Sequence, residues 1–139
     1  MLRLRLLGAL TAEADGRPVA MPSSERARTL IGWLALHRGI HPRAAVAGLL
    51  WPDTPEAGAR ASLRTAVWAV RQAWGPFAEV LVSSRAEIGL PAGVVWVDAL
   101  DSDVAADDSE LLPGVGDEWA DEERSAHRAR RAQSLADLA

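Results

Sequence analysis

The sequence predicts a fold of the α+β class, in which strands precede and follow a segment of three helices. Leucines alternate with arginines over residues 2–6, which is the period of a half-buried strand. Between residues 25 and 74, apolar residues recur at helical spacing and are interrupted by glycine and proline. Two short apolar segments separated by a turn follow near residue 80, which predicts a β-hairpin.

The first 22 residues are predicted to form a small antiparallel sheet. In the strand over residues 2–6, the leucines share one face and the arginines share the other. The pair Asp15-Gly16 is a turn signal, and residues 17–21 then read as a second short strand. One face of this sheet would cover the core.

The first helix is predicted to begin after Pro22-Ser23-Ser24 and to end at Gly39. A serine can cap the helix, and Glu25 lies at its positive end. We expect its apolar face to consist of Ala27, Leu30, Trp33, Leu34 and His37.

Two further helices are predicted between residues 42 and 74. The second begins near Pro42 and ends at Trp51-Pro52-Asp53, and the third begins with Thr54 as its cap and Pro55 at its first helical position. The residues predicted to be buried by the second helix are Val46, Leu49 and Leu50. The core stripe predicted for the third helix is Leu63, Val67, Val70 and Trp74.

Beyond the third helix, the sequence predicts a hairpin, a last strand, a linker and one more helix. The hairpin strands lie over residues 80–82 and 87–90, the last strand over 94–97 and the helix over 119–138, after a Leu-Leu-Pro-Gly anchor at 111–114. We therefore expect a domain over residues 1–98, an acidic linker over 99–110 and a helical tail over 111–139.

The predicted order of sheet, three helices and hairpin is typical of a winged helix-turn-helix. Three segments carry a more specific likeness. They are Ala27 to Gly39 (ARTLIGWLALHRG), Leu49 to Asp53 (LLWPD) and Ala59 to Val67 (ARASLRTAV). With Val94 to Asp98 (VVWVD), these segments resemble the DNA-binding domain of the Streptomyces antibiotic regulatory protein (SARP) family. The Leu-Leu-Pro-Gly anchor and the acidic start of the last helix resemble part of that family's bacterial transcriptional activation domain.

The resemblance implies an OmpR-type winged helix that binds promoter DNA. The chain departs from the family in two respects. The helical segment that the family carries before the Leu-Leu-Pro-Gly anchor is reduced to residues 100–110, and only one helix follows the anchor. We therefore expect a truncated activation domain over residues 111–139.

Candidate DNA contacts lie on the third helix and at the hairpin tip. Arg60, Arg64 and Arg71 form a stripe beside the core stripe, with Trp68 at its edge, and this position suits phosphate contacts. Residues on the side opposite the core would face base edges. They are Ser62, Thr65, Ala69 and Gln72, where the family tends to carry arginine at positions 69 and 72. Arg85 at the hairpin tip is placed to contact backbone or minor groove.

Composition excludes several classes of function. The chain of 139 residues has no cysteine, and all 15 basic residues are arginine, which excludes thiol and Schiff-base chemistry. We find no catalytic constellation, metal site or phosphate loop, and predict neither an enzyme nor a cofactor. Because no apolar run approaches the length of a membrane span, we expect a cytoplasmic protein.

The net charge of −4 is unevenly distributed. Residues 1–97 hold 11 arginines against 7 acidic residues, whereas residues 98–139 hold 4 arginines against 12 acidic residues. We expect double-stranded DNA to bind the first part. For the C-terminal helix the expected partners are RNA polymerase or a second copy of the chain. The alternative hypothesis is a protein-interaction module that keeps the winged-helix fold and has lost sequence-specific DNA binding.

Overall fold

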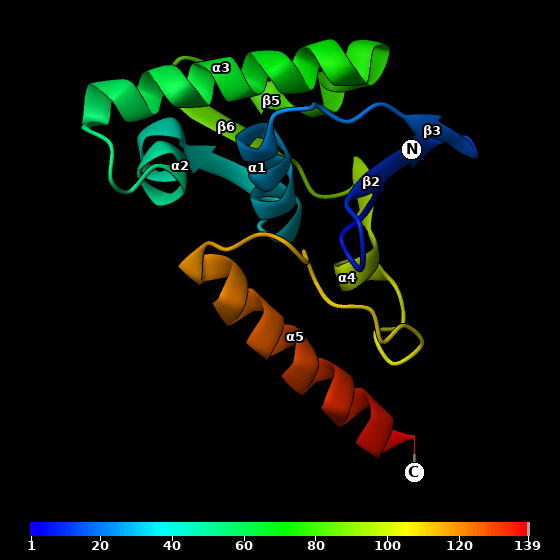
Figure 1. The fold of residues 1–139 in the computed structure, drawn as a ribbon. Helices are drawn as coiled ribbons and strands as arrows, with labels where there is room; N and C mark the ends of the chain where they lie inside the picture. Colours follow the sequence, from blue (N-terminus) through cyan, green and yellow to red (C-terminus); the bar gives the residue numbers. More distant parts are fainter. Residues whose placement is uncertain (139) are drawn as a thin grey trace.

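Two β-sheets flank three helices in the computed structural model, which describes residues 1–138 (Figure 1). This confirms the predicted α+β winged-helix architecture. The strands are β1 (Leu2–Arg5), β2 (Thr11–Ala14), β3 (Arg17–Val19), β4 (Gly39–Pro42), β5 (Val82–Ser83), β6 (Glu87–Leu90) and β7 (Val95–Val97). The α-helices are α1 (Glu25–Leu36), α2 (Arg43–Leu50), α3 (Glu56–Trp74), α4 (Asp98–Asp101) and α5 (Glu118–Asp137).

The N-terminal sheet has the strand order β3-β2-β1-β7. Its first three strands are antiparallel, which confirms the antiparallel sheet predicted for residues 1–22, although β2 is not among the two strands predicted there. The fourth strand, β7, pairs in parallel with β1, so that Leu2 is opposite Val95 and Leu4 is opposite Val97. All four of these side chains are buried, because the alternation along each strand directs them toward the helices. The strand β7 therefore places residues 95–97 beside the N-terminal strand of the chain.

The second sheet has the order β4-β6-β5 and carries the predicted hairpin as β5 and β6, which we call the wing. Two expectations need correction here. Residues 39–42 form the strand β4 instead of a bare connection between helices, and residue 80 ends a 3-10 helix over Gly75–Val80 instead of starting a strand. A Cβ atom at Gly89 would lie only 1.8 Å from the carbonyl oxygen of Gly39, so the pairing of β4 with β6 requires glycine at that position.

The helices begin close to where the sequence predicts. Ser24 caps α1 by accepting a 3.3 Å hydrogen bond from the backbone N–H of Ala27. The predicted cap of α3 is wrong. Pro55, not Thr54, occupies the cap position with extended backbone angles, and no side chain caps this helix. The predicted core stripe of α3 is confirmed, since Leu63, Val67, Val70 and Trp74 are all buried.

The segment after β7 packs on the N-terminal sheet. Asp98 is buried, and its carboxylate accepts hydrogen bonds from the backbone N–H groups of Leu6 at 2.8 Å and Leu7 at 3.1 Å. Leu111 and Leu112 of the predicted anchor are also buried, and the N–H of Leu112 donates to the carbonyl oxygen of Leu6 at 2.8 Å. This anchor therefore joins the same hydrophobic core as the three helices.

The last helix, α5, lies on the side of α1 away from α3, and its C-terminal half extends beyond the rest of the chain (Figure 1). Trp119 and Ala120 in its first turn are buried, whereas its later apolar side chains Ala126, Ala129, Leu135 and Leu138 are exposed. His127, in the middle of α5, is only 3% exposed, and burial lowers its pKa below the ordinary value. Within residues 1–138, no helix is both long enough and apolar enough to cross a membrane.

Candidate nucleic-acid interface

A groove of about 1040 Å³ separates α3 from the tip of the wing. The α3 wall carries Arg60, Arg64, Trp68 and Arg71, and the wing supplies Arg85. The structure thus brings together five of the residues that the sequence predicts as DNA contacts. They meet because the arginine stripe lies beside the core stripe of α3, and the edge of the core is where the wing packs.

Arg43, at the start of α2, also lines the groove, and the sequence reasoning missed it. Its Nη1 group donates a 2.7 Å hydrogen bond to Oγ of Ser83, and its backbone N–H donates to the carbonyl oxygen of Ala86 at 2.9 Å. Burial lowers the pKa of Arg43, and the positive charges of Arg64 and Arg71 lower it further. The sequence does contain a hint of this role. Arg43 lies in the first turn of α2, where the positive end of the helix disfavours a cation, so an arginine at this position suggests a function other than helix stability.

The groove is strongly positive. Among residues 1–138, Arg60 is the one arginine of the groove with an acidic partner, Glu56 at 3.7 Å. Both side chains of that pair are more than half exposed, so water screens the interaction strongly. No residue after β7 lines the groove, so the acidic C-terminal part of the described chain does not neutralise it.

Trp68 is the large aromatic side chain of the groove and is 62% exposed. Its ring is therefore not packed into the core beneath α3 or the wing. An exposed tryptophan between arginines presents an apolar ring at a positive surface. Side chains of this kind are common where a protein binds another molecule.

The predicted base-facing residues of α3 are divided between different surfaces. Ser62 and Thr65 line a separate depression of about 340 Å³ on the other flank of the helix, beside Ser24 and Trp51. The hydroxyl of Thr65 donates to the carbonyl oxygen of Ala61 at 3.2 Å, which leaves its oxygen free to accept. Gln72 is exposed and lies in neither depression.

The described part of the chain shows no group of three or more histidine and acidic side chains that could hold a metal ion. His37 and His41 each contact a backbone carbonyl oxygen, those of Trp33 and His37 respectively. The candidate functional site is therefore the large positively charged groove between α3 and the wing, which we call the arginine groove.

The fold and this groove define the chain as a winged helix-turn-helix protein. No family model matches the sequence, and no curated protein matches it. Among solved structures, it is similar to EmbR of Mycobacterium tuberculosis, determined in complex with a low-affinity phosphopeptide. That likeness has a TM-score of 0.72 at 20% sequence identity and covers 96% of this chain but 43% of EmbR. The chain therefore spans less than half the length of this neighbour, and the likeness shows the fold.

Proposed function

We propose that the chain binds double-stranded DNA and regulates transcription, with α3 in the major groove and the wing against the adjoining backbone. The observation that carries the proposal is the convergence of five arginines from α2, α3 and the wing on one groove. The likeness of the sequence to the SARP DNA-binding domain supports the same function, as does the winged-helix fold.

In this arrangement, one sugar-phosphate strand lies in the groove between α3 and the wing. Arg43, Arg60, Arg64 and Arg71 approach it from the helical wall, and Arg85 approaches it from the wing. Such contacts hold the protein on the duplex and fix its orientation, but they carry no sequence information. The exposed ring of Trp68 adds an apolar contact to the sugar at the middle of the groove.

We assign the recognition of DNA bases to Ser62, Thr65 and Gln72. Hydroxyl groups can pair with several bases, and a glutamine can pair with adenine through two hydrogen bonds. Because Ala69 offers no hydrogen bond in this part of the helix, we expect modest discrimination between sites, with most of the affinity coming from phosphate contacts.

A salt titration of DNA binding tests the proposal. Each phosphate that an arginine neutralises releases condensed counterions, so about 3–5 contacts give a slope of about −3 to −5 in log K against log salt concentration. Fluorescence anisotropy on a random-sequence duplex measures the slope. Absence of binding at low salt, or binding that does not depend on salt, would contradict the proposal.

A protein-interaction module with the same fold is the second candidate function. Two observations favour it, namely the net charge of −4 and the absence of arginine from the base-facing positions of α3. The two functions differ in their response to DNA. A protein that has lost this activity gives no salt-dependent anisotropy change with any duplex, and substitution of the groove arginines then has no effect on it.

A further inference from the structure

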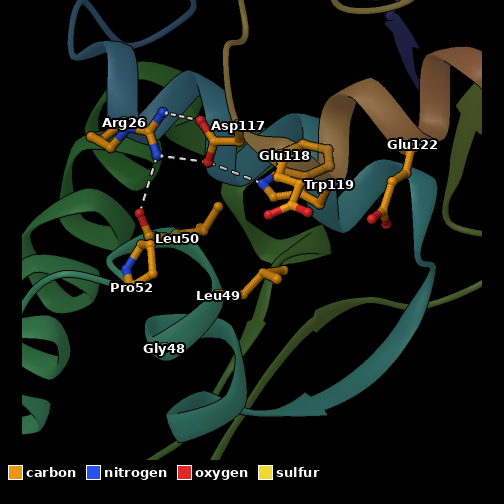
Figure 2. A pocket seen from close by; sticks show the side chains of 9 residues that line it. All are labelled: Arg26, Gly48, Leu49, Leu50, Pro52, Asp117, Glu118, Trp119 and Glu122. Atoms are coloured by element: carbon orange, nitrogen blue, oxygen red, sulfur yellow. Dashed lines mark hydrogen bonds and ion pairs between the residues drawn. The ribbon is translucent and has the colours of Figure 1, made fainter.

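A second cavity, of about 550 Å³, lies between α2, the turn that follows it and the first turn of α5 (Figure 2). Its apolar lining comes from Leu49, Leu50, Pro52 and Trp119. The cavity shares no lining residue with the arginine groove, so an inference about its ligand stands apart from the proposed DNA binding. A pocket of this size with apolar walls and a few polar groups has the usual character of a ligand site.

One charged pair at the cavity is already satisfied. Arg26 forms two hydrogen bonds with Asp117, from Nη2 to Oδ1 at 2.7 Å and from Nη1 to Oδ2 at 3.0 Å. The hydrogen bond from Arg26 holds the pKa of Asp117 below its usual range, and the same bond raises the pKa of Arg26. The indole Nε1–H of Trp119 also donates to Oδ2 of Asp117 at 3.0 Å, which fixes the ring beside the cavity. This pair adds no net charge.

Two further carboxylates have no such partner. Glu118 and Glu122 lie one turn apart on α5, and Figure 2 shows both carboxylates directed toward the space above Leu49. Neither has an arginine or histidine nitrogen within 4 Å in the described chain. Since the Arg26–Asp117 pair cancels, the cavity carries a net charge of −2 from these two side chains.

We propose that this cavity binds an arginine side chain presented by a basic segment of a partner protein. The aliphatic part of the arginine packs against Leu49, Pro52 and the ring of Trp119, and the guanidinium group meets Glu118 and Glu122. The guanidinium group has five N–H donors in one plane, so it can form hydrogen bonds with two carboxylates at once. The single ammonium group of lysine is less suited to this. A phosphorylated or acidic segment is excluded from the cavity because the two carboxylates repel it.

A substitution at Gly48 is suited to blocking the cavity. It lies on α2 and lines the cavity, and a Cβ atom built on it meets no other atom within 4 Å. We therefore expect a leucine at this position to occupy part of the cavity without disturbing the core. The change also removes a glycine from a helix interior, which favours the helix.

The test uses the full chain and a short peptide of alternating leucine and arginine, with the indole N–H signal of Trp119 followed in ¹H–¹⁵N spectra. We expect a saturable shift of this signal, and no shift with the same peptide carrying citrulline, which keeps the shape of arginine and removes its charge. The Gly48→Leu variant should lose the response, and the double variant Glu118→Gln and Glu122→Gln should bind about tenfold more weakly.

The matched control is Glu79→Gln, which removes an exposed acidic residue remote from the cavity and should bind the peptide like the parent chain. The remaining amide signals of each variant report whether the fold is retained. The proposal is overturned if the arginine peptide leaves the Trp119 signal unchanged, if citrulline serves equally well, or if a folded Gly48→Leu variant binds as tightly as the parent chain.

Discussion

Arg43 reaches across from α2 to donate a 2.7 Å hydrogen bond to Oγ of Ser83, at the beginning of the wing. Together with the backbone bond from Arg43 to Ala86, this contact joins the helical wall of the arginine groove to its opposite wall. The spacing between the two walls is therefore set by a side chain that also carries one of the groove's charges. Such a residue contributes both position and electrostatic attraction to a bound strand.

Arg43→Ala is expected to weaken binding to DNA of every sequence and to reduce the salt slope by about 1. The reason is the loss of one phosphate contact and of the link to the wing. Anisotropy titrations on two unrelated duplexes measure both quantities. Arg17→Ala is the matched control, since Arg17 is an exposed arginine on β3 and does not line the groove. Equal losses in the two variants would show that the groove has no special role.

Arg64→Ala and Thr65→Ala are expected to separate affinity from specificity. Arg64 lies in the arginine groove, so its loss should weaken binding to all sites by a similar factor. Thr65 lies on the other flank of α3 with its oxygen free to accept, so its loss should change the order of preference among sites. Competition against a panel of duplexes measures the order. A uniform loss with Thr65→Ala would remove it from the base-reading face.

Leu63→Ala is expected to reduce the free energy of unfolding by about 2–5 kcal/mol, because it leaves a cavity under α3. Leu63 is completely buried, whereas Leu138 near the end of α5 is 74% exposed. Leu138→Ala should therefore change stability by less than about 0.5 kcal/mol. Urea denaturation followed by tryptophan fluorescence compares the two. A stable Leu63→Ala variant would contradict the packing of α3 against the core.

Features that depend on neighbours in the sequence could be predicted from it. The buried stripe of α3 follows from helical spacing alone, and the cap of α1 follows from one serine three residues before Ala27. The arginine stripe beside Leu63 follows from the same arithmetic. These elements are determined locally, so the pattern of the chain is enough to place them.

Features that depend on distant contacts could not be predicted in the same way. The pairing of β7 with β1 joins residues more than 90 positions apart, and the residues of the strand over 94–97 do not indicate which strand it pairs with. The burial of His127 was missed because α5 is rich in arginine and alanine on several faces, so its spacing does not select one face. Arg43 lines the groove because the wing packs beside the start of α2, and the sequence does not specify where the wing packs.

The pH dependence of stability should reveal His127 as a buried neutral side chain. Burial, followed by the charge of Arg130, lowers its pKa in the folded chain, whereas the unfolded chain has the ordinary histidine pKa of about 6.5. The unfolded state therefore binds more protons just below pH 6.5. Stability from this group is fully present above that pH and declines as the pH falls, by up to about 1.4 kcal/mol per pH unit.

A comparison with His127→Phe isolates this contribution, since the variant keeps an aromatic ring and cannot take up a proton. The parent chain should lose free energy of unfolding relative to the variant between about pH 6.5 and pH 5, and the difference should level off above pH 7. Thermal or urea unfolding at several pH values measures the difference. A difference that does not depend on pH would mean that His127 has the same pKa in the folded and the unfolded chain.

Truncation should show which part of the chain after β7 belongs to the folded core. Leu111 and Leu112 are buried against the N-terminal sheet and α1, and the N–H of Gly8 donates to the carbonyl oxygen of Glu110 at 2.8 Å. A fragment of residues 1–98 loses all of these contacts, whereas a fragment of residues 1–128 keeps them. We expect 1–98 to lose several kcal/mol in the free energy of unfolding, since two buried leucines are removed.

The fragment 1–128 should remain within about 1 kcal/mol of the full chain, because the helical turns it lacks are mostly exposed. Leu111→Ala in the full chain provides a matched point change, with an expected cost of about 2–5 kcal/mol. If 1–98 unfolds at the same urea concentration as 1–128, the winged helix is complete without the anchor. In that outcome the buried leucines only cover the sheet, and the division at residue 98 predicted from the sequence describes an autonomous domain.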